Sequence, residues 1–399
     1  MRLDQATPEQ LHKLEASLSE QYHSFQQSGL SLDLTRGKPS AEQLTLSNGL
    51  DSILNGQYTD SSGTDLRNYG GLDGIPEAKT LFSEVIGVNP QEILIGGNSS
   101  LTLMYFAIHF ALHLGVNDSD SAWINEVKPI KFLAPVPGYD RHFSICEHLG
   151  IELLPVAMND DGPDMDQVEA LLKADPQIKG IWCVPRFSNP TGIVYSDEVV
   201  ARIAKLGLIA GENFRVFWDN AYAVHVLDKD APQLANLMDY CRQLNTQDSV
   251  YIFGSTSKIT FAGAGVAFMA SSPANLAVIK RHMGMASIGP DKINQLRHVK
   301  LLKDQETLKA HMAQHAAIMK PRFDAVLERL NSDLADSGIA DWTEPRGGYF
   351  ISFNTQPGLA REVIRLAAEA GVKLTPAGAT FPYGKDPENK NIRIAPTYP

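Results

Sequence analysis

Short apolar runs alternate with polar, helix-forming stretches through the middle of the chain. The runs at residues 132–134, 180–184, 215–218 and 250–253 contain almost no polar side chain. Continuous apolar runs are typical of strands buried on both faces of a parallel sheet, and helical stretches between them are typical of α/β proteins. The pattern predicts an α/β fold with a mostly parallel central sheet flanked by helices.

Helical spacing of apolar residues dominates the rest of the chain. It predicts an amphipathic helix over residues 8–28, an apolar helix over 101–114, long helices over 292–304 and 308–331, and a further helix over 358–370. Residues 346–353 alternate in the manner of a half-buried strand. We find no internal repeat and no low-complexity tract.

Each of the four central runs ends in a polar turn. The turns occupy residues 135–142, 185–192, 219–222 and 254–258. Because ligands of parallel α/β sheets bind beyond the carboxyl ends of the strands, the coincidence predicts a site at that edge.

Lys258 ends the last of these turns, after Gly254 and three small hydroxyl-bearing residues. A desolvated lysine has a lowered pKa and can act as a nucleophile that forms a Schiff base. Taken alone, the turn favours a surface lysine over a reactive one.

Residues 96–100 form a second candidate site, Gly-Gly-Asn-Ser-Ser, between a predicted strand at 92–95 and the apolar helix. The free N–H groups and the dipole of a helix N-terminus favour an anion there, such as a phosphate.

Composition narrows the class of protein. A net charge of -11 and a pI near 5.5 argue against nucleic-acid and anionic-membrane partners. The three cysteines are widely spaced and indicate neither a disulfide framework nor a metal site, so we expect a reducing compartment. The N-terminus lacks the apolar core of a signal peptide, and no apolar run approaches the ~18 residues of a membrane span. We therefore expect a cytoplasmic protein.

The motifs together resemble the fold-type I, pyridoxal-phosphate-dependent aminotransferases of the aspartate aminotransferase superfamily, most closely the bacterial subgroup Ic. The resemblance covers nearly the whole chain, and its motifs stand in the family's order: Asn189-Pro190-Thr191-Gly192, Asp219 with Tyr222, Ser257-Lys258 and Arg393. It implies an N-terminal arm over 1–45, a large cofactor-binding domain over 46–295 and a smaller α+β domain over 296–399.

The resemblance also implies catalytic roles. Lys258 would bind pyridoxal 5′-phosphate covalently and then, once released, move the substrate's proton as base and acid. Asp219 would pair with the pyridine nitrogen, while Tyr222 and Asn189 would bind the ring oxygen. By resemblance, further contacts to the cofactor come from Asn98, Ser99, Ser100, Tyr139, Ser255, Ser257 and, across a homodimer with shared sites, Tyr69.

The implied substrates are an acidic L-amino acid, most plainly aspartate, and 2-oxoglutarate. Arg393 would bind the α-carboxylate with a bidentate fork, close to Gly37 and Asn189. The distal carboxylate needs a second cation, for which Arg141 is favoured over Arg36 and Lys38 because its turn would face the cofactor.

Three features depart from the family pattern. No arginine follows Lys258 by about eight residues to meet the phosphate, since Gly265 and Val266 stand there. The aromatic residue nearest to the usual stacking position is Tyr139, where many relatives have tryptophan. The chain also ends soon after Arg393, which suggests a shortened C-terminus.

Other functions remain open at this point. The same scaffold supports β-lyases, decarboxylases and aminotransferases for aromatic or small neutral amino acids. An aminotransferase-like domain of a transcription regulator is disfavoured because only about 30 residues precede Arg36, too few for a DNA-binding domain. A dinucleotide enzyme is disfavoured because residues 263–265 lack the third glycine of the fingerprint.

Overall fold

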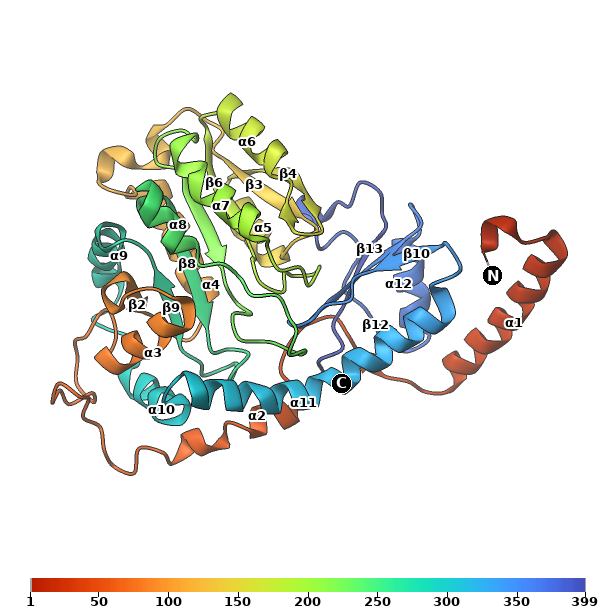
Figure 1. Ribbon diagram of the computed structural model, residues 1–399, viewed down its shortest axis with the longest axis horizontal. Coiled ribbons are helices and arrows are strands. Elements are labelled where there is room, and N and C mark those ends of the chain that lie inside the picture. Colours follow the sequence, from red (N-terminus) through yellow and green to blue (C-terminus); the bar gives the residue numbers. More distant parts are fainter. Residues whose placement is uncertain (1, 399) are drawn as a thin grey trace.

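A computed structural model describes residues 2–398 and shows an α/β fold around one large sheet (Figure 1). Within these residues the sheet has eight strands in the order β2-β9-β8-β7-β6-β3-β4-β5. The five neighbours from β8 to β4 are parallel, whereas β9 and β5 run antiparallel to them. The strands are β2 (Ile93–Ile95), β3 (Lys131–Val136), β4 (Glu152–Asn159), β5 (Gly162–Pro163), β6 (Ile178–Cys183), β7 (Arg215–Asp219), β8 (Val250–Ser255) and β9 (Ala267–Ala270). The predicted fold class is confirmed.

Hydrophobic packing on both faces explains why the central strands read as continuous apolar runs. On β7, Trp218 belongs to a hydrophobic cluster with residues of the helices on one face of the sheet. Phe217 belongs to a second cluster with residues of the helices on the other face. Successive side chains of a strand point to opposite faces, so a sheet covered on both sides needs apolar residues at every position.

Helices α3 to α10 flank the sheet, and the remaining helices lie outside it (Figure 1). Their bounds are α1 (Pro8–Gln27), α2 (Ala41–Thr45), α3 (Pro76–Ile86), α4 (Ser100–His113), α5 (Asp140–His148), α6 (Met165–Ala174), α7 (Asp197–Lys205), α8 (Leu237–Leu244), α9 (Pro273–Ala286), α10 (Lys292–Leu302), α11 (Gln305–Leu334) and α12 (Ala360–Glu369). The helices predicted from spacing are therefore present, with ends shifted by a few residues. No helix among residues 2–398 is long and apolar enough to cross a membrane.

Smaller sheets bring the two ends of the chain together. The antiparallel sheet β10-β11-β13 combines β10 (Ala340–Trp342), β11 (Ile351–Thr355) and β13 (Asn391–Ile394). Strand β1 (Leu32–Asp33) pairs in parallel with β12 (Val372–Lys373). Helix α11 runs from the large sheet to this second group of strands (Figure 1). The division into three parts expected from sequence, with boundaries at residues 45/46 and 295/296, stays a prediction.

The strand predicted over residues 346–353 is wrong in its first half. Strand β11 begins only at Ile351, because Gly348 has a left-handed φ of 78° that a strand cannot contain. Gly347 instead forms an isolated antiparallel bridge with Val226, in the loop after β7. The glycine pair thus ties the C-terminal sheet to the edge of the large sheet.

We expect Gly347→Ala to destabilise the protein by about 1–3 kcal/mol, because a Cβ would overlap the Phe187 ring and lie 2.5 Å from the His225 carbonyl oxygen. Gly49→Ala is the matched control, since its nearest neighbour would be a Leu301 methyl group at 3.8 Å. Urea unfolding measures both. Equal midpoints for the two variants would contradict the close packing at Gly347.

Candidate functional site

The polar turns after β3, β6, β7 and β8 meet at one edge of the sheet, as the sequence predicts. Lys258 Nζ lies 4.9 Å from the centre of the Tyr222 ring and 6.0 Å from that of Tyr349. Burial lowers the pKa of Lys258, and the negative charge of nearby Asp219 opposes the shift only in part. No carboxylate forms a salt bridge with this lysine in the described chain. A lysine with a lowered pKa and no ion-pair partner is a candidate nucleophile.

Asp219 ends β7 as a buried carboxylate, 2% exposed. Its Oδ2 accepts a hydrogen bond from His142 Nε2 at 2.9 Å, and the His142 ring stacks on Trp182 with 4.1 Å between centres. Its Oδ1 is buried and has no partner among residues 2–398. A buried carboxylate oxygen without a donor is costly, so this atom marks the place of a missing donor.

Tyr222 and Tyr139 line the same region. Burial raises the pKa of Tyr222 well above its usual value, with further contributions from Tyr139 and Asp219. Burial also raises the pKa of Tyr139 to about 12. The Tyr139 ring meets His142 edge-to-face, with 4.9 Å between ring centres. Both tyrosines therefore keep their protons at neutral pH and can donate hydrogen bonds.

Arg393 joins three distant segments. Its Nη1 donates to Asp140 Oδ1 at 3.0 Å and to Asn189 Oδ1 at 3.2 Å. Its Nη2 makes a long, 3.4 Å bond to the Thr35 carbonyl, and its Nε is buried without a partner in the described residues. The Phe350 ring lies 5.0 Å from the guanidinium carbon. One edge of the guanidinium is thus almost free.

Gly37 lies close to this arginine cluster. A Cβ at position 37 would be 2.5 Å from the Phe350 ring, so no larger residue fits there without movement. Gly37 and Arg393 thus both lie against the Phe350 ring.

The candidate phosphate turn stands beside the lysine turn. Asn98 Nδ2 donates to the Gly263 carbonyl at 3.1 Å, and Ser257 Oγ donates to the Asn98 carbonyl at 3.4 Å. Ser255 Oγ donates to Ser257 Oγ at 3.1 Å. Ser99 makes no side-chain cap for α4, which begins at Ser100, so backbone N–H groups at this helix start are available to an anion.

Four predicted residues do not join these contacts. Tyr69 is 84% exposed and reaches no site residue of its own chain. Arg141 is exposed and lines an outer groove of about 320 Å³ between α4 and α5. Lys38 Nζ lies 3.7 Å from the centre of the Tyr398 ring. Arg36 is exposed, and its side chain has no bond or ring contact within residues 2–398.

Sequence reasoning missed two residues near the site. His142 lies one helical turn after Tyr139, and that spacing is the signal that could have paired it with Asp219. Arg297, on α10, lines a cavity of about 360 Å³ together with Asn98 and Gly265. No local motif points to Arg297, because only the packing of α10 against the turn brings it there.

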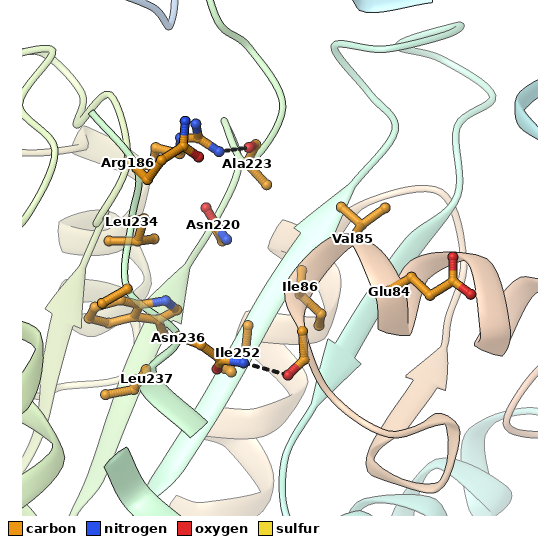
Figure 2. Close-up of a pocket in the computed structure, with 14 residues that line it drawn as sticks. Glu84, Val85, Ile86, Arg186, Asn220, Ala223, Leu234, Asn236, Leu237 and Ile252 are labelled. Carbon is orange, nitrogen blue, oxygen red and sulfur yellow. Dashed lines mark hydrogen bonds between the residues drawn. The ribbon is translucent and has the colours of Figure 1, made fainter. Parts of the chain in front are cut away.

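A second cavity, of about 270 Å³, lies between the C-terminal end of α3 and the segments that follow β7 (Figure 2). Trp218 and Ile252, which pack on the α3 side, line it. Arg186 donates to the Ala223 carbonyl at its rim, as the dashed line shows. This bond fixes the turn that directly follows Asp219.

Comparison with known proteins agrees with this geometry. The aspartate amino-transferase family model matches residues 6–399. An aspartate aminotransferase of Corynebacterium glutamicum is 46% identical over 383 residues, which cover 96% of this chain and 88% of that protein. The crystal structure of an aspartate transaminase from Corynebacterium glutamicum has a TM-score of 0.95 at 44% identity and covers 100% of this chain and 94% of its own.

A more distant structure shares the fold. An α-aminoadipate aminotransferase of Thermus thermophilus, 22% identical, has a TM-score of 0.74 and covers 95% of this chain and 90% of its own. With a family model across almost the whole sequence and a close relative of the same architecture, the chain belongs to the aspartate aminotransferase family and is a fold-type I aminotransferase.

Proposed function

We propose that this aminotransferase moves the amino group of aspartate to 2-oxoglutarate by a ping-pong mechanism, with pyridoxal 5′-phosphate as its cofactor. The observation that carries the proposal is the presence of two groups in one site. Lys258 is an amine with a lowered pKa, and Asp219 is a buried carboxylate with one oxygen that has no hydrogen-bond partner within residues 2–398. The 46% identity to an aspartate aminotransferase supports the choice of amino donor.

The side chains at the sheet edge fit this cofactor. Asp219 Oδ1 needs a donor, and the protonated pyridine nitrogen is one. Tyr222 and Asn189 offer hydrogen bonds to the ring oxygen, and Tyr139 offers an aromatic face. The phosphate would be bound at the start of α4 by Asn98, Ser99, Ser100, Ser255 and Ser257. When bound, the cofactor supplies a ring that accepts electrons from the substrate's α-carbon.

Lys258 has two tasks in this proposal. Its Nζ would hold the cofactor covalently, and the same amine, when free, would move a proton from the substrate's α-carbon to the cofactor. Both tasks need a neutral amine, which the lowered pKa favours. Asp219 assists by keeping the pyridine nitrogen protonated, and His142 holds Asp219 in place through their 2.9 Å hydrogen bond.

Arg393 is our candidate for binding the substrate's α-carboxylate. Its Nε lacks a partner and its Nη2 has only the long bond to Thr35, so this edge is available for two parallel hydrogen bonds. Its Nη1 bonds to Asp140 and Asn189 hold the guanidinium in a fixed direction.

For the distal carboxylate we propose Arg36 in preference to Arg141, the residue that sequence alone favours. Arg36 directly follows Thr35, whose carbonyl oxygen accepts a hydrogen bond from Arg393. The Arg36 side chain is exposed and has no partner within residues 2–398. Arg141 faces the outer groove, and Lys38 is occupied by the Tyr398 ring.

We further propose a homodimer in which Tyr69 reaches the cofactor phosphate of the second copy. The exposure of this tyrosine, 84%, supports that role, because a large aromatic side chain on a glycine-rich loop is otherwise left in water. The division into an arm, a large domain and a small domain, and a cytoplasmic location, belong to the same proposal.

The cofactor and half-reaction can be tested by absorption spectroscopy of the purified protein. We expect a visible band from the lysine-bound cofactor that disappears when aspartate alone is added, with the band of pyridoxamine phosphate in its place. Lys258→Ala should lack the initial band because no amine holds the cofactor. If aspartate leaves the band unchanged but another amino acid converts it, the assignment of aspartate as the amino donor is wrong. No band after incubation with pyridoxal phosphate would overturn the cofactor.

Arg36→Ala should reduce kcat/KM for aspartate about 10- to 100-fold, because a charged partner of the distal carboxylate is lost. We expect kcat/KM for alanine, which lacks that carboxylate, to change less than about threefold. Arg141→Ala is the matched control and should leave the ratio of the two substrates unchanged. The opposite result for the two variants would assign the distal carboxylate to Arg141.

Arg297 is our candidate for the cation that relatives place eight residues after the lysine. Since it shares a cavity with Asn98 and Gly265, Arg297→Ala should weaken binding of pyridoxal phosphate about tenfold. Binding of pyridoxal, which has no phosphate, should not change, and Arg297→Lys should retain most of the affinity. Equal losses for both ligands would contradict a phosphate contact.

A further inference from the structure

Two buried donors meet the backbone carbonyl of Lys258. Its oxygen accepts a hydrogen bond from His225 Nε2 at 3.2 Å and a longer one from Tyr349 Oη at 3.4 Å. His225 is 3% exposed and Tyr349 is fully buried. A carbonyl oxygen has two acceptor sites, so both are used.

The next carbonyl, of Ile259, is held in the same way from another element. His311 Nε2 lies 2.8 Å from it, and His315 also bonds to it. The Nε2 atoms of these two histidines are 3.2 Å apart and share a hydrogen bond, so the two rings are also coupled to each other.

Gln43 completes the network and determines which of its neighbours donate hydrogen bonds and which accept them. Its Oε1 accepts the backbone N–H of the α2 cap, so its Nε2 faces His315 Nδ1 and Tyr349 Oη, each at 3.1 Å. His315 Nδ1 must then be an acceptor, which keeps its proton on Nε2. The Tyr349 hydroxyl accepts a hydrogen bond from Gln43 and donates one to the Lys258 carbonyl oxygen. These assignments are consistent with a neutral His315 ring.

The surroundings keep the histidines neutral. Burial and the nearby Lys258 lower the pKa of His225 to about 3, and Arg186 adds to the effect. Burial and His311 lower the pKa of His315 to about 4. His225 and His315 are therefore uncharged across the physiological range, and His225 orients the turn without repelling a charged amine.

Four separate segments supply these groups. Gln43 comes from α2, a few residues after the Arg36 turn, and the histidine pair comes from α11. His225 and Tyr349 stand on either side of the bridge between Val226 and Gly347. The lysine turn is thus connected to the N-terminal segment, the long helix and the C-terminal sheet.

We propose that His225 and Tyr349, supported by Gln43, are positioning residues that fix the backbone of Lys258 and thereby the direction of its side chain. The inference rests on the proposed function, in which this lysine must alternate between the cofactor and the substrate's α-carbon. A displaced catalytic group can cost about a hundredfold in rate even when its chemistry is intact.

The test compares His225→Leu, which removes the donor, with His225→Gln, whose side-chain amide can again donate to the carbonyl. Each variant is purified as the holoenzyme. The first readout is visible circular dichroism per bound cofactor, which reports how rigidly the lysine-bound cofactor is held. The second is the separation of kcat from KM for aspartate. Tyr349→Phe removes one hydroxyl and provides a milder variant should His225→Leu fold poorly.

His298→Leu is the matched control. His298 is as buried as His225 and lies 2.8 Å from Thr260 Oγ1 in the same turn, but no bond joins it to either carbonyl. We expect it to lower the melting temperature while leaving the dichroism signal and kcat within about twofold of wild type.

For His225→Leu we expect kcat to fall about tenfold or more with KM within about twofold, and the dichroism signal to fall by about a third or more. Both should recover in His225→Gln, and Tyr349→Phe should show the same changes in smaller measure. Unchanged dichroism and kcat in both His225→Leu and Tyr349→Phe, or equal changes in His298→Leu, would overturn the inference. A wild-type protein without the cofactor band would overturn the proposed function instead.

Discussion

The site depends on a carboxylate buried at the end of an apolar strand. Asp219 follows Phe217 and Trp218, which fill the clusters on either side of the sheet, and is itself 2% exposed. Burying this charge is tolerable only with donors around it, and His142 supplies one. The oxygen that remains free has a direction fixed by the strand, so the chain itself defines where a cationic ring nitrogen would bind.

The same carboxylate and the same burial act in opposite directions on Lys258. Burial lowers the pKa of the lysine, while the charge of Asp219 raises it, and burial is the larger effect. Once the carboxylate is engaged by a positively charged partner, its attraction for the lysine weakens, and the neutral amine is favoured further. The pKa of Lys258 therefore depends on whether a positively charged group is bound to Asp219.

Local patterns predict the part of the site that lies on single strands. Asp219, Asn189 and Lys258 each lie in the polar turn that follows an apolar run, and the rule for parallel sheets brings such turns together. What cannot be read from pattern is contact between distant segments. Residues 346–353 alternate like a strand, but only the part from Ile351 onward joins the sheet. Arg141 stands one residue before His142, yet it is exposed whereas His142 is buried.

Those distant contacts concern the two ends of the chain. Arg393, near the C-terminus, bonds to the Thr35 carbonyl near the N-terminus, and Gln43 reaches the Lys258 carbonyl through Tyr349. The large sheet and its loops therefore present Asp219, Lys258 and the His225 donor, but neither the arginine edge nor the second donor, Tyr349. These two are added when the first and last segments pack against the sheet edge, so the free edge of Arg393 and the Tyr349 contact to the lysine turn depend on the same packing of the chain ends.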